Sequence, residues 1–175
     1  VRGKVTAEIL AAAGEADLVS LGSAGYTQIG WPQLGLNLKA ALSTGRPLLI
    51  PGRRAGSGSG LLMVHDDTPA DVRALNAAAG LAARGGLGLH VLALAPTPGR
   101  LEQLLAEISA QVADWELEAD VQGSTDEPRL AIPAAVRRLR PAMVVLGIEA
   151  DDEAGQERVH RLLRMLECSL LVVPN

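Results

Sequence analysis

Short apolar runs alternate along the chain with longer segments of helical periodicity. An apolar run of about four to eight residues between turn residues is typical of a buried strand, whereas apolar residues three and four positions apart are typical of a helix. Strands that alternate with helices of ordinary length predict βαβ units and an α/β fold with a doubly wound parallel sheet. The pattern predicts helices at 5–13, 36–43, 69–84, 98–113, 129–140 and 153–167, and strands at 18–21, 47–51, 61–64, 87–94, 115–121, 143–147 and 170–173.

The chain also contains an internal repeat. The segment ADLVSLG at 16–22 corresponds to PAMVVLG at 141–147, and RPLLIP at 46–51 corresponds to CSLLVVP at 168–174. A segment rich in glycine and serine, GRRAGSGSG, separates the two copies and has the composition of a flexible linker. We therefore predict a first unit at 1–52, a linker at 53–60 and a complete second unit at 61–175. Because the helical pattern starts at once and the first residue is valine, we expect the front of the first unit to be missing from this sequence.

Three glycines follow the first predicted strand. Two residues separate Gly22 from Gly25, and nine separate Gly25 from Gly35. A glycine at the carboxyl end of a parallel strand lets the backbone turn sharply and present N–H groups to an anion, and the dipole of the next helix favours phosphate. Taken alone, the spacing is also that of a glycine-rich surface turn, which is the commoner case.

In this setting the glycine spacing resembles the G-2x-G-9x-G-[S/T] nucleotide loop of the universal stress protein family. The resemblance includes the strands on either side and the tandem organisation, and it covers nearly the whole chain apart from the linker. It implies a Rossmann-like, five-stranded parallel sheet of the adenine nucleotide alpha-hydrolase type in each unit. It also implies a loop that wraps the ribose and phosphates of ATP. The family's ATP binders carry Ser or Thr after the third glycine, where this chain has Leu36, and Asn37 comes one position late.

The resemblance also assigns a role to the start of the second unit. In the family, Asp-Gly-Ser follows the first strand and the aspartate contacts adenine; Asp66 is the match, with Asp67-Thr68 in place of Gly-Ser. From the residues alone, the commoner role of these three side chains is to cap the helix that begins at Pro69. The implied cofactor is ATP or another adenine nucleotide, with Mg only as its companion. The implied cofactor-binding residues are Gly22, Ser23, Gly25, Gly35, Leu36, Asn37 and Asp66.

The corresponding loop of the second unit does not look like a phosphate site. Gly147 stands alone, and Ala150 occupies the position of the second glycine. Carboxylates in a phosphate site repel the ligand unless a metal intervenes. An acidic run is more often the first turn of a helix, where the dipole favours negative charge, than a metal site. The carboxylates around this loop are Glu149, Asp151, Asp152 and Glu153.

The composition of the chain argues against several classes of function, namely nucleic-acid binding, membrane spanning and catalysis. The net charge is −4 and no basic block occurs, so nucleic acid is not an expected partner. No apolar run approaches the roughly 20 residues needed to span a bilayer, and we expect a cytoplasmic location. The single cysteine, Cys168, excludes an internal disulfide. His65, His90 and His160 have neither metal-ligand spacing nor an accompanying nucleophile, so we expect no enzyme beyond weak ATPase activity.

Two interpretations of function remain open. In the first, the chain is a stress-response module that binds adenine nucleotide through the glycine loop of the first unit. In the second, it is a family member without ATP binding that acts through dimerisation and recognition of a protein partner. Tyr26 and Trp31 lie inside the glycine loop and would suit either role. By resemblance, the last strands of the units, Leu48–Ile50 and Leu170–Val173, would pair in a homodimer or in an intramolecular pseudo-dimer.

Overall fold

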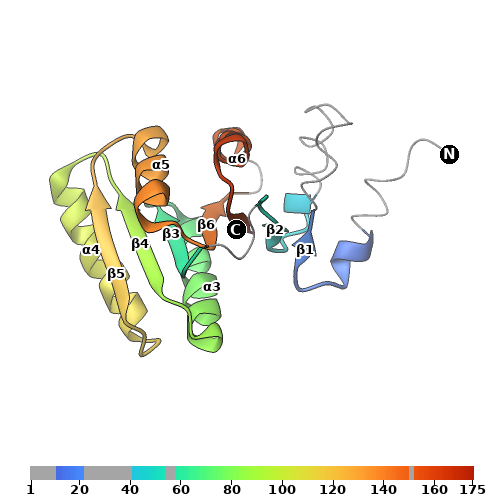
Figure 1. The fold of residues 1–175 in the computed structure, drawn as a ribbon, viewed down its shortest axis with the longest axis horizontal. Coiled ribbons are helices and arrows are strands. Elements are labelled where there is room, and N and C mark those ends of the chain that lie inside the picture. The colour runs from blue at the N-terminus through green and yellow to red at the C-terminus, as the bar shows by residue number, and fades with distance from the viewer. Residues whose placement is uncertain (1–10, 22–40, 54–57, 150–151) are drawn as a thin grey trace.

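The computed structural model describes residues 11–21, 41–53, 58–149 and 152–175. Within these residues, strands form one sheet in the order β1-β2-β7-β6-β3-β4-β5 (Figure 1). The strands are β1 (Val19–Ser20), β2 (Leu48–Ile50), β3 (Leu61–His65), β4 (Leu89–Leu94), β5 (Ala119–Ser124), β6 (Met143–Ile148) and β7 (Ser169–Pro174). The helices are α3 (Pro69–Gly85), α4 (Pro98–Ala113), α5 (Pro128–Leu139) and α6 (Glu153–Met165).

The second unit is a doubly wound domain. Its strands β5, β4, β3, β6 and β7 are parallel neighbours in that order. Helices α3 and α4 cover one face of this sheet, and α5 and α6 cover the other (Figure 1). The predicted α/β doubly wound fold is confirmed. The winding reverses between β3 and β6, and in such sheets ligands bind at the carboxyl ends of the strands at that point.

Each face of the sheet has its own apolar core. Under α5 and α6, Leu62, Val64 and Val144 pack against Ile132 and Leu162. Under α3 and α4, the alternate residues of the same strands pack against the two other helices, because successive side chains of a strand point to opposite faces. Aliphatic side chains and alanine carry almost all of this packing, as expected for a chain with no phenylalanine.

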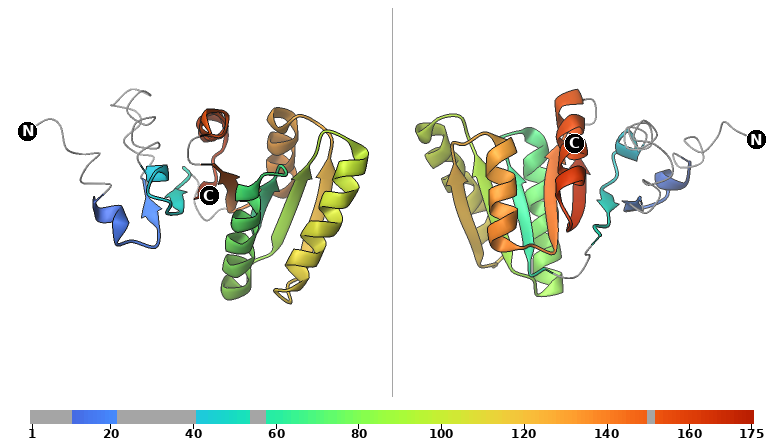
Figure 2. Two further views of the ribbon diagram at one scale, coloured as in Figure 1. Left: turned by 180° about the vertical axis from the view of Figure 1, so that it is seen from behind. Right: turned by 45° about the horizontal axis from the view of Figure 1, so that its top comes forward.

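Among the described residues, the segment predicted as the first unit joins the second through the antiparallel pairing of β2 with β7. Strand β2 lies beside β7, with Leu48 opposite Val172 and Ile50 opposite Leu170, and β1 continues the sheet parallel to β2 (Figure 2). Leu48 and Ile50 are fully buried and belong to the core under α5 and α6. Apolar packing is therefore continuous across the pairing of β2 with β7. Association of two separate chains through these strands stays a prediction.

Several element boundaries differ from the sequence pattern. The predicted strand at 115–121 is wrong for its first four residues, because α4 is followed by a turn in which Glu116 has a φ of 51° and β5 begins at Ala119. The Trp115 indole instead donates a hydrogen bond to Asn76 Oδ1 on α3. On α3, Val72 is exposed although it fitted the apolar spacing. The predicted buried strand at 18–21 is short, and Leu18 is exposed.

The described end of the linker lies against the second unit. The Ser59 N–H donates to the carbonyl of Arg140 at 3.2 Å, and the Ala142 N–H donates to the carbonyl of Gly60 at 3.0 Å. A Cβ at Gly58 would lie 2.4 Å from the Arg140 carbonyl oxygen. Glycine is therefore needed at this position for close approach of two backbone segments. Residues 54–57 of the predicted linker, and most of the two predicted helices at 5–13 and 36–43, lie outside the described residues.

Gly147 lies within strand β6, as the predicted strand at 143–147 has it. A Cβ added there would lie 2.6 Å from the backbone carbonyl of Ala70 at the start of α3. Helix α3 can therefore approach β6 closely only because residue 147 has no side chain. Since the obstructing atoms are backbone atoms, no change of rotamer could relieve the contact.

We expect Gly147→Ala to lower the free energy of unfolding by about 2 kcal/mol or more, because α3 would have to move away from the sheet. Urea denaturation would measure the loss. Gly99→Ala is the matched control, since nothing lies within 4 Å of an added Cβ at that exposed position. Equal stability of the two variants would show that the close approach of α3 and β6 contributes nothing.

Candidate functional site

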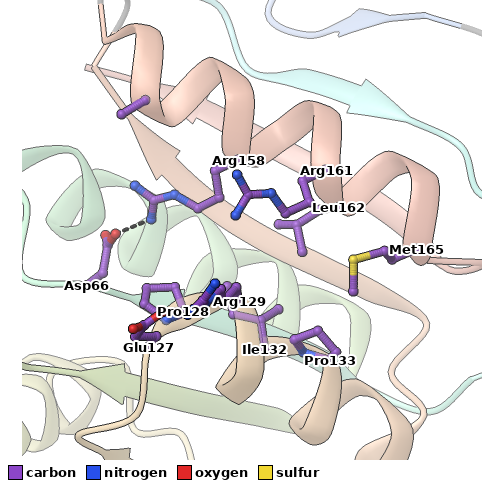
Figure 3. Close-up of a pocket in the computed structure, with 11 residues that line it drawn as sticks. Asp66, Glu127, Pro128, Arg129, Ile132, Pro133, Arg158, Arg161, Leu162 and Met165 are labelled. Atoms are coloured by element: carbon purple, nitrogen blue, oxygen red, sulfur yellow. Dashed lines mark hydrogen bonds and ion pairs between the residues drawn. The ribbon is translucent and has the colours of Figure 1, made fainter.

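The candidate site lies at the carboxyl ends of β3 and β6, where the winding of the sheet reverses. Asp66 directly follows β3, and its carboxylate forms an ion pair with Arg158 of α6 (Figure 3). The two side chains are 14% and 21% exposed, respectively. This pair therefore fixes the orientation of Asp66 and links the end of β3 to α6.

The two oxygens of this carboxylate have different surroundings. Asp66 Oδ2 accepts a hydrogen bond from Arg158 Nη1, whereas Oδ1 is buried and has no hydrogen-bond partner among the described residues. Buried polar atoms are nearly always hydrogen-bonded to protein or water. Within the described part of the chain, Asp71 Oδ1 is also buried without a partner, and a hydrogen bond to Asp66 contributes to the raised pKa of Asp71. A proton shared between Asp71 and Asp66 therefore satisfies Asp66 Oδ1.

Helix α3 is capped by Thr68, not by Asp66 or Asp67. Thr68 is the N-cap residue, and both its backbone N–H, at 3.0 Å, and its hydroxyl, at 2.7 Å, donate to Asp71 Oδ2. The Asp66 N–H donates to the same oxygen at 3.1 Å. The capping prediction is therefore correct for Thr68 and wrong for the two aspartates. The spacing of Thr68 and Asp71 is that of a capping box with an aspartate in the last position.

Asp67 holds a backbone conformation that usually belongs to glycine. Its φ is 66°, in the left-handed region that side chains disfavour. It occupies the position that the resemblance assigns to glycine in Asp-Gly-Ser. Its carboxylate receives hydrogen bonds from Arg100 Nε at 2.6 Å and from Arg100 Nη2 at 2.5 Å, and the hydrogen bond to Arg100 holds the Asp67 pKa below its usual value. The bidentate ion pair between Asp67 and Arg100 of α4 thus stabilises the turn after β3.

His65 is not placed to act as a base. It is the last residue of β3, and burial lowers its pKa. Its Nδ1 accepts a hydrogen bond from the Asp67 N–H at 3.3 Å. The ring therefore stabilises the turn after β3 as a neutral imidazole. Among the described residues, no group of three or more His, Cys, Asp or Glu could hold a metal ion.

Asp71 is a buried carboxyl next to the candidate site. Burial, and then hydrogen bonding and charge repulsion from Asp66, raise the pKa of Asp71 to about 7. An unfolded chain would lose this proton near pH 4. Between these two values the folded protein keeps a proton that the unfolded chain releases. The contribution of Asp71 to stability therefore falls as the pH rises from about 4 to about 7.

We expect Asp71→Asn to remove this pH dependence. The amide oxygen can accept the same hydrogen bonds, and the amide nitrogen faces Asp66 without a negative charge. The stability of the variant relative to wild type should increase from about pH 4 to about pH 7 and then level off, as measured by urea denaturation at each pH up to pH 8. Asp114→Asn, which removes an exposed carboxylate, controls for the change in net charge. A relative stability of Asp71→Asn that is flat across this range would contradict the raised pKa.

The first turn of α6 is already occupied by a carboxylate of the chain itself. Asp152 caps this helix, accepting hydrogen bonds from the Ala154 N–H at 3.0 Å and the Gly155 N–H at 2.9 Å. Glu153 adds a second carboxylate to the same turn. The prediction of an acidic helix start is confirmed for these two residues. The N–H groups that could meet a phosphate therefore meet Asp152 instead.

Of the predicted cofactor-binding residues, only Asp66 can be placed. The others, Gly22, Ser23, Gly25, Gly35, Leu36 and Asn37, lie outside the described residues, as do Tyr26 and Trp31. The structure does place the strand that leads into the glycine loop. The Leu21 N–H donates to the carbonyl of Leu49 at 3.0 Å, so the parallel pairing of β1 and β2 runs up to the residue before Gly22.

A cavity of about 270 Å³ opens beside Asp66, between α5 and α6. Ile132 of α5 and Leu162 of α6 contribute buried apolar surface to its wall. No sequence motif marks this cavity, because its residues come from segments that are far apart in the chain. The basic residues that line it are Arg129 of α5 and Arg158 and Arg161 of α6 (Figure 3).

The fold resembles that of several solved structures. A universal stress protein from Archaeoglobus fulgidus DSM 4304 matches with a TM-score of 0.78 and 17% identity, over 97% of this chain and 65% of that one. A universal stress protein in complex with cAMP matches with a TM-score of 0.57 and 15% identity, over 67% of this chain and 98% of that one. A universal stress protein from Archaeoglobus fulgidus in complex with dAMP matches with a TM-score of 0.51 and 16% identity, over 66% of this chain and 96% of that one.

These matches define the fold. The chain has the Rossmann-like α/β fold of the universal stress proteins, as the glycine spacing and strand order predicted. It spans 65% of the length of the first of these structures. The sequence matches no protein-family model and no curated protein. Within the described residues, no helix is both long enough and apolar enough to cross a membrane.

Proposed function

We propose that the chain is a stress-response module of the universal stress protein type that binds an adenine nucleotide through the glycine loop of its first unit. The observation that carries this proposal is the parallel pairing of β1 with β2 up to Leu21, directly before Gly22. A glycine loop at the carboxyl end of a parallel strand can direct several backbone N–H groups toward phosphate. Two proteins of the same fold in complex with cAMP and dAMP support an adenine nucleotide as the ligand.

The second unit does not offer an equivalent site. The N–H groups at the start of α6 are capped by Asp152, and Arg158 holds the Asp66 carboxylate. A nucleotide bound there would have to displace a carboxylate at one end and share Asp66 with a guanidinium at the other. We therefore assign phosphate binding to the first unit. Asp66 as an adenine contact stays a prediction.

The second interpretation, a module that acts through partner recognition without ATP, has its own support. Leu36 has no hydroxyl for phosphate, and β2 and β7 pair antiparallel within one chain, which supports the pseudo-dimer form of the association that the resemblance implies. In either case the protein would act by binding. Catalysis beyond slow hydrolysis of a bound nucleotide is not part of the proposal.

The decisive experiment restores the missing hydroxyl. We expect Leu36→Ser to tighten ATP binding by roughly tenfold, since a hydrogen bond to a charged phosphate is worth about 1.5 kcal/mol. We expect Gly35→Asp to abolish binding, because it adds a side chain and a negative charge to the loop. Isothermal titration of the full chain with ATP in the presence of Mg²⁺ would measure both effects.

Two controls make the titration specific. Gly99→Ala changes an exposed glycine in α4 and should leave the affinity unchanged. Asp66→Asn tests the adenine contact: a weaker affinity would assign Asp66 to the nucleotide site. If wild type and Leu36→Ser both fail to bind ATP, the proposal is wrong and the interpretation without ATP is favoured.

A further inference from the structure

We propose that the cavity between α5 and α6 is a binding site for a small organic anion, a phosphate or carboxylate that carries an apolar body. This site lies in the second unit, apart from the glycine loop to which we assign phosphate binding, although Asp66, the predicted adenine contact, is among its lining residues. Two features of the cavity indicate this class of ligand. The first is the set of arginines that line it, and the second is its apolar wall.

Arginines outnumber carboxylates among the residues that line the cavity. Three guanidinium groups line it, from Arg129, Arg158 and Arg161, against two carboxylates, from Asp66 and Glu127. The arginines come from both helices, so the cavity has cationic groups on two sides (Figure 3). The planar guanidinium group matches the oxygen atoms of phosphate and carboxylate, to which it can donate two hydrogen bonds at once.

Only one of these arginines is firmly engaged. The Asp66–Arg158 pair is largely shielded from solvent, and breaking it would leave a buried carboxylate unpaired. The other two pairs are exposed: Arg129 with Glu127, at 61% and 62%, and Arg161 with Glu157 at 4.0 Å, at 51% and 60%. Exposed ion pairs contribute little to stability and exchange readily. Arg129 and Arg161 are therefore available to a ligand, whereas Arg158 is not.

The apolar wall of the cavity would contact the apolar body of the proposed ligand. Ile132 and Leu162 are almost fully buried and face each other from α5 and α6, with Pro133 beside them. Met165 lies at the rim and is 48% exposed, and methionine adapts its shape to an apolar ligand. A cavity of about 270 Å³ is below the usual range for drug-sized ligands, roughly 300 Å³ upward. A ligand the size of one aromatic ring with its anionic group would fill it.

The methionine methyl groups report on the two faces of the sheet separately, and the arginine variants below distinguish this cavity from a second one that Met165 also lines. The chain has three: Met165 lines the cavity, while Met63 and Met143 pack on the opposite face of the sheet. The experiment is a titration of the full chain, labelled at the methionine methyl groups, followed by NMR. The probes are phenyl phosphate, phenylacetate, inorganic phosphate and benzyl alcohol.

We expect phenyl phosphate or phenylacetate to shift the Met165 methyl signal saturably while the Met63 signal stays in place. Whichever of the two binds more tightly identifies the anionic group. Inorganic phosphate and benzyl alcohol should each bind at least about tenfold more weakly, because each offers only half of the required chemistry. Failure of both aromatic anions to shift Met165, or equal binding of inorganic phosphate, would overturn the proposal.

The variants separate this site from a general attraction of anions to positive charge. The double variant Arg129→Gln/Arg161→Gln removes the two exchangeable guanidinium groups from exposed positions and should weaken binding by at least about tenfold. The double variant Arg73→Gln/Arg137→Gln removes two exposed arginines outside the cavity and makes the same change in net charge. It should bind as wild type does. Equal weakening in both double variants would show that no defined site exists.

Discussion

The antiparallel pairing of β2 with β7 is the contact on which the two-unit arrangement depends. Strand β2 holds three residues and β1 two, too few to be stable alone, since an isolated strand pair is marginal in water. Pairing with β7 supplies backbone hydrogen bonds and buries Leu48 and Ile50 among Leu170 and Val172. The Gly52 N–H, just after β2, also donates to Ser169 Oγ at 3.3 Å. The glycine loop thus starts from a strand whose position the second unit determines.

The carboxyl ends of the strands in the second unit carry a particular arrangement of charges. Asp152 caps the N–H groups at the start of α6, and Arg158 holds the Asp66 carboxylate. Arginines of α5 and α6 line the cavity beside Asp66. These charged residues can change without affecting the two apolar cores, because the cores are built from the buried faces of the strands and helices.

Sequence patterns predicted the second unit well, because buried strands and amphipathic helices follow directly from the spacing of apolar residues. They failed where tertiary contacts decided the outcome. Trp115 was assigned to a strand but contacts α3. Gly147 was correctly placed in a strand, but no sequence pattern indicated that it allows α3 to approach β6. The capping role of Thr68 with Asp71 could have been recognised from their spacing. The Asp66–Arg158 pair could not, because its members are 92 residues apart and no motif links them.

The joint between the units also has a consequence for the order of folding. Gly52 and Ser169, which meet there, are 117 residues apart in the sequence, and contacts between such distant residues form slowly because a long loop must close first. The remaining strands of the second unit pair around β3 through contacts that are closer in the sequence. We therefore expect the pairing of β2 with β7 to form after the core of the second unit, so that β1 and β2 gain their support late in folding.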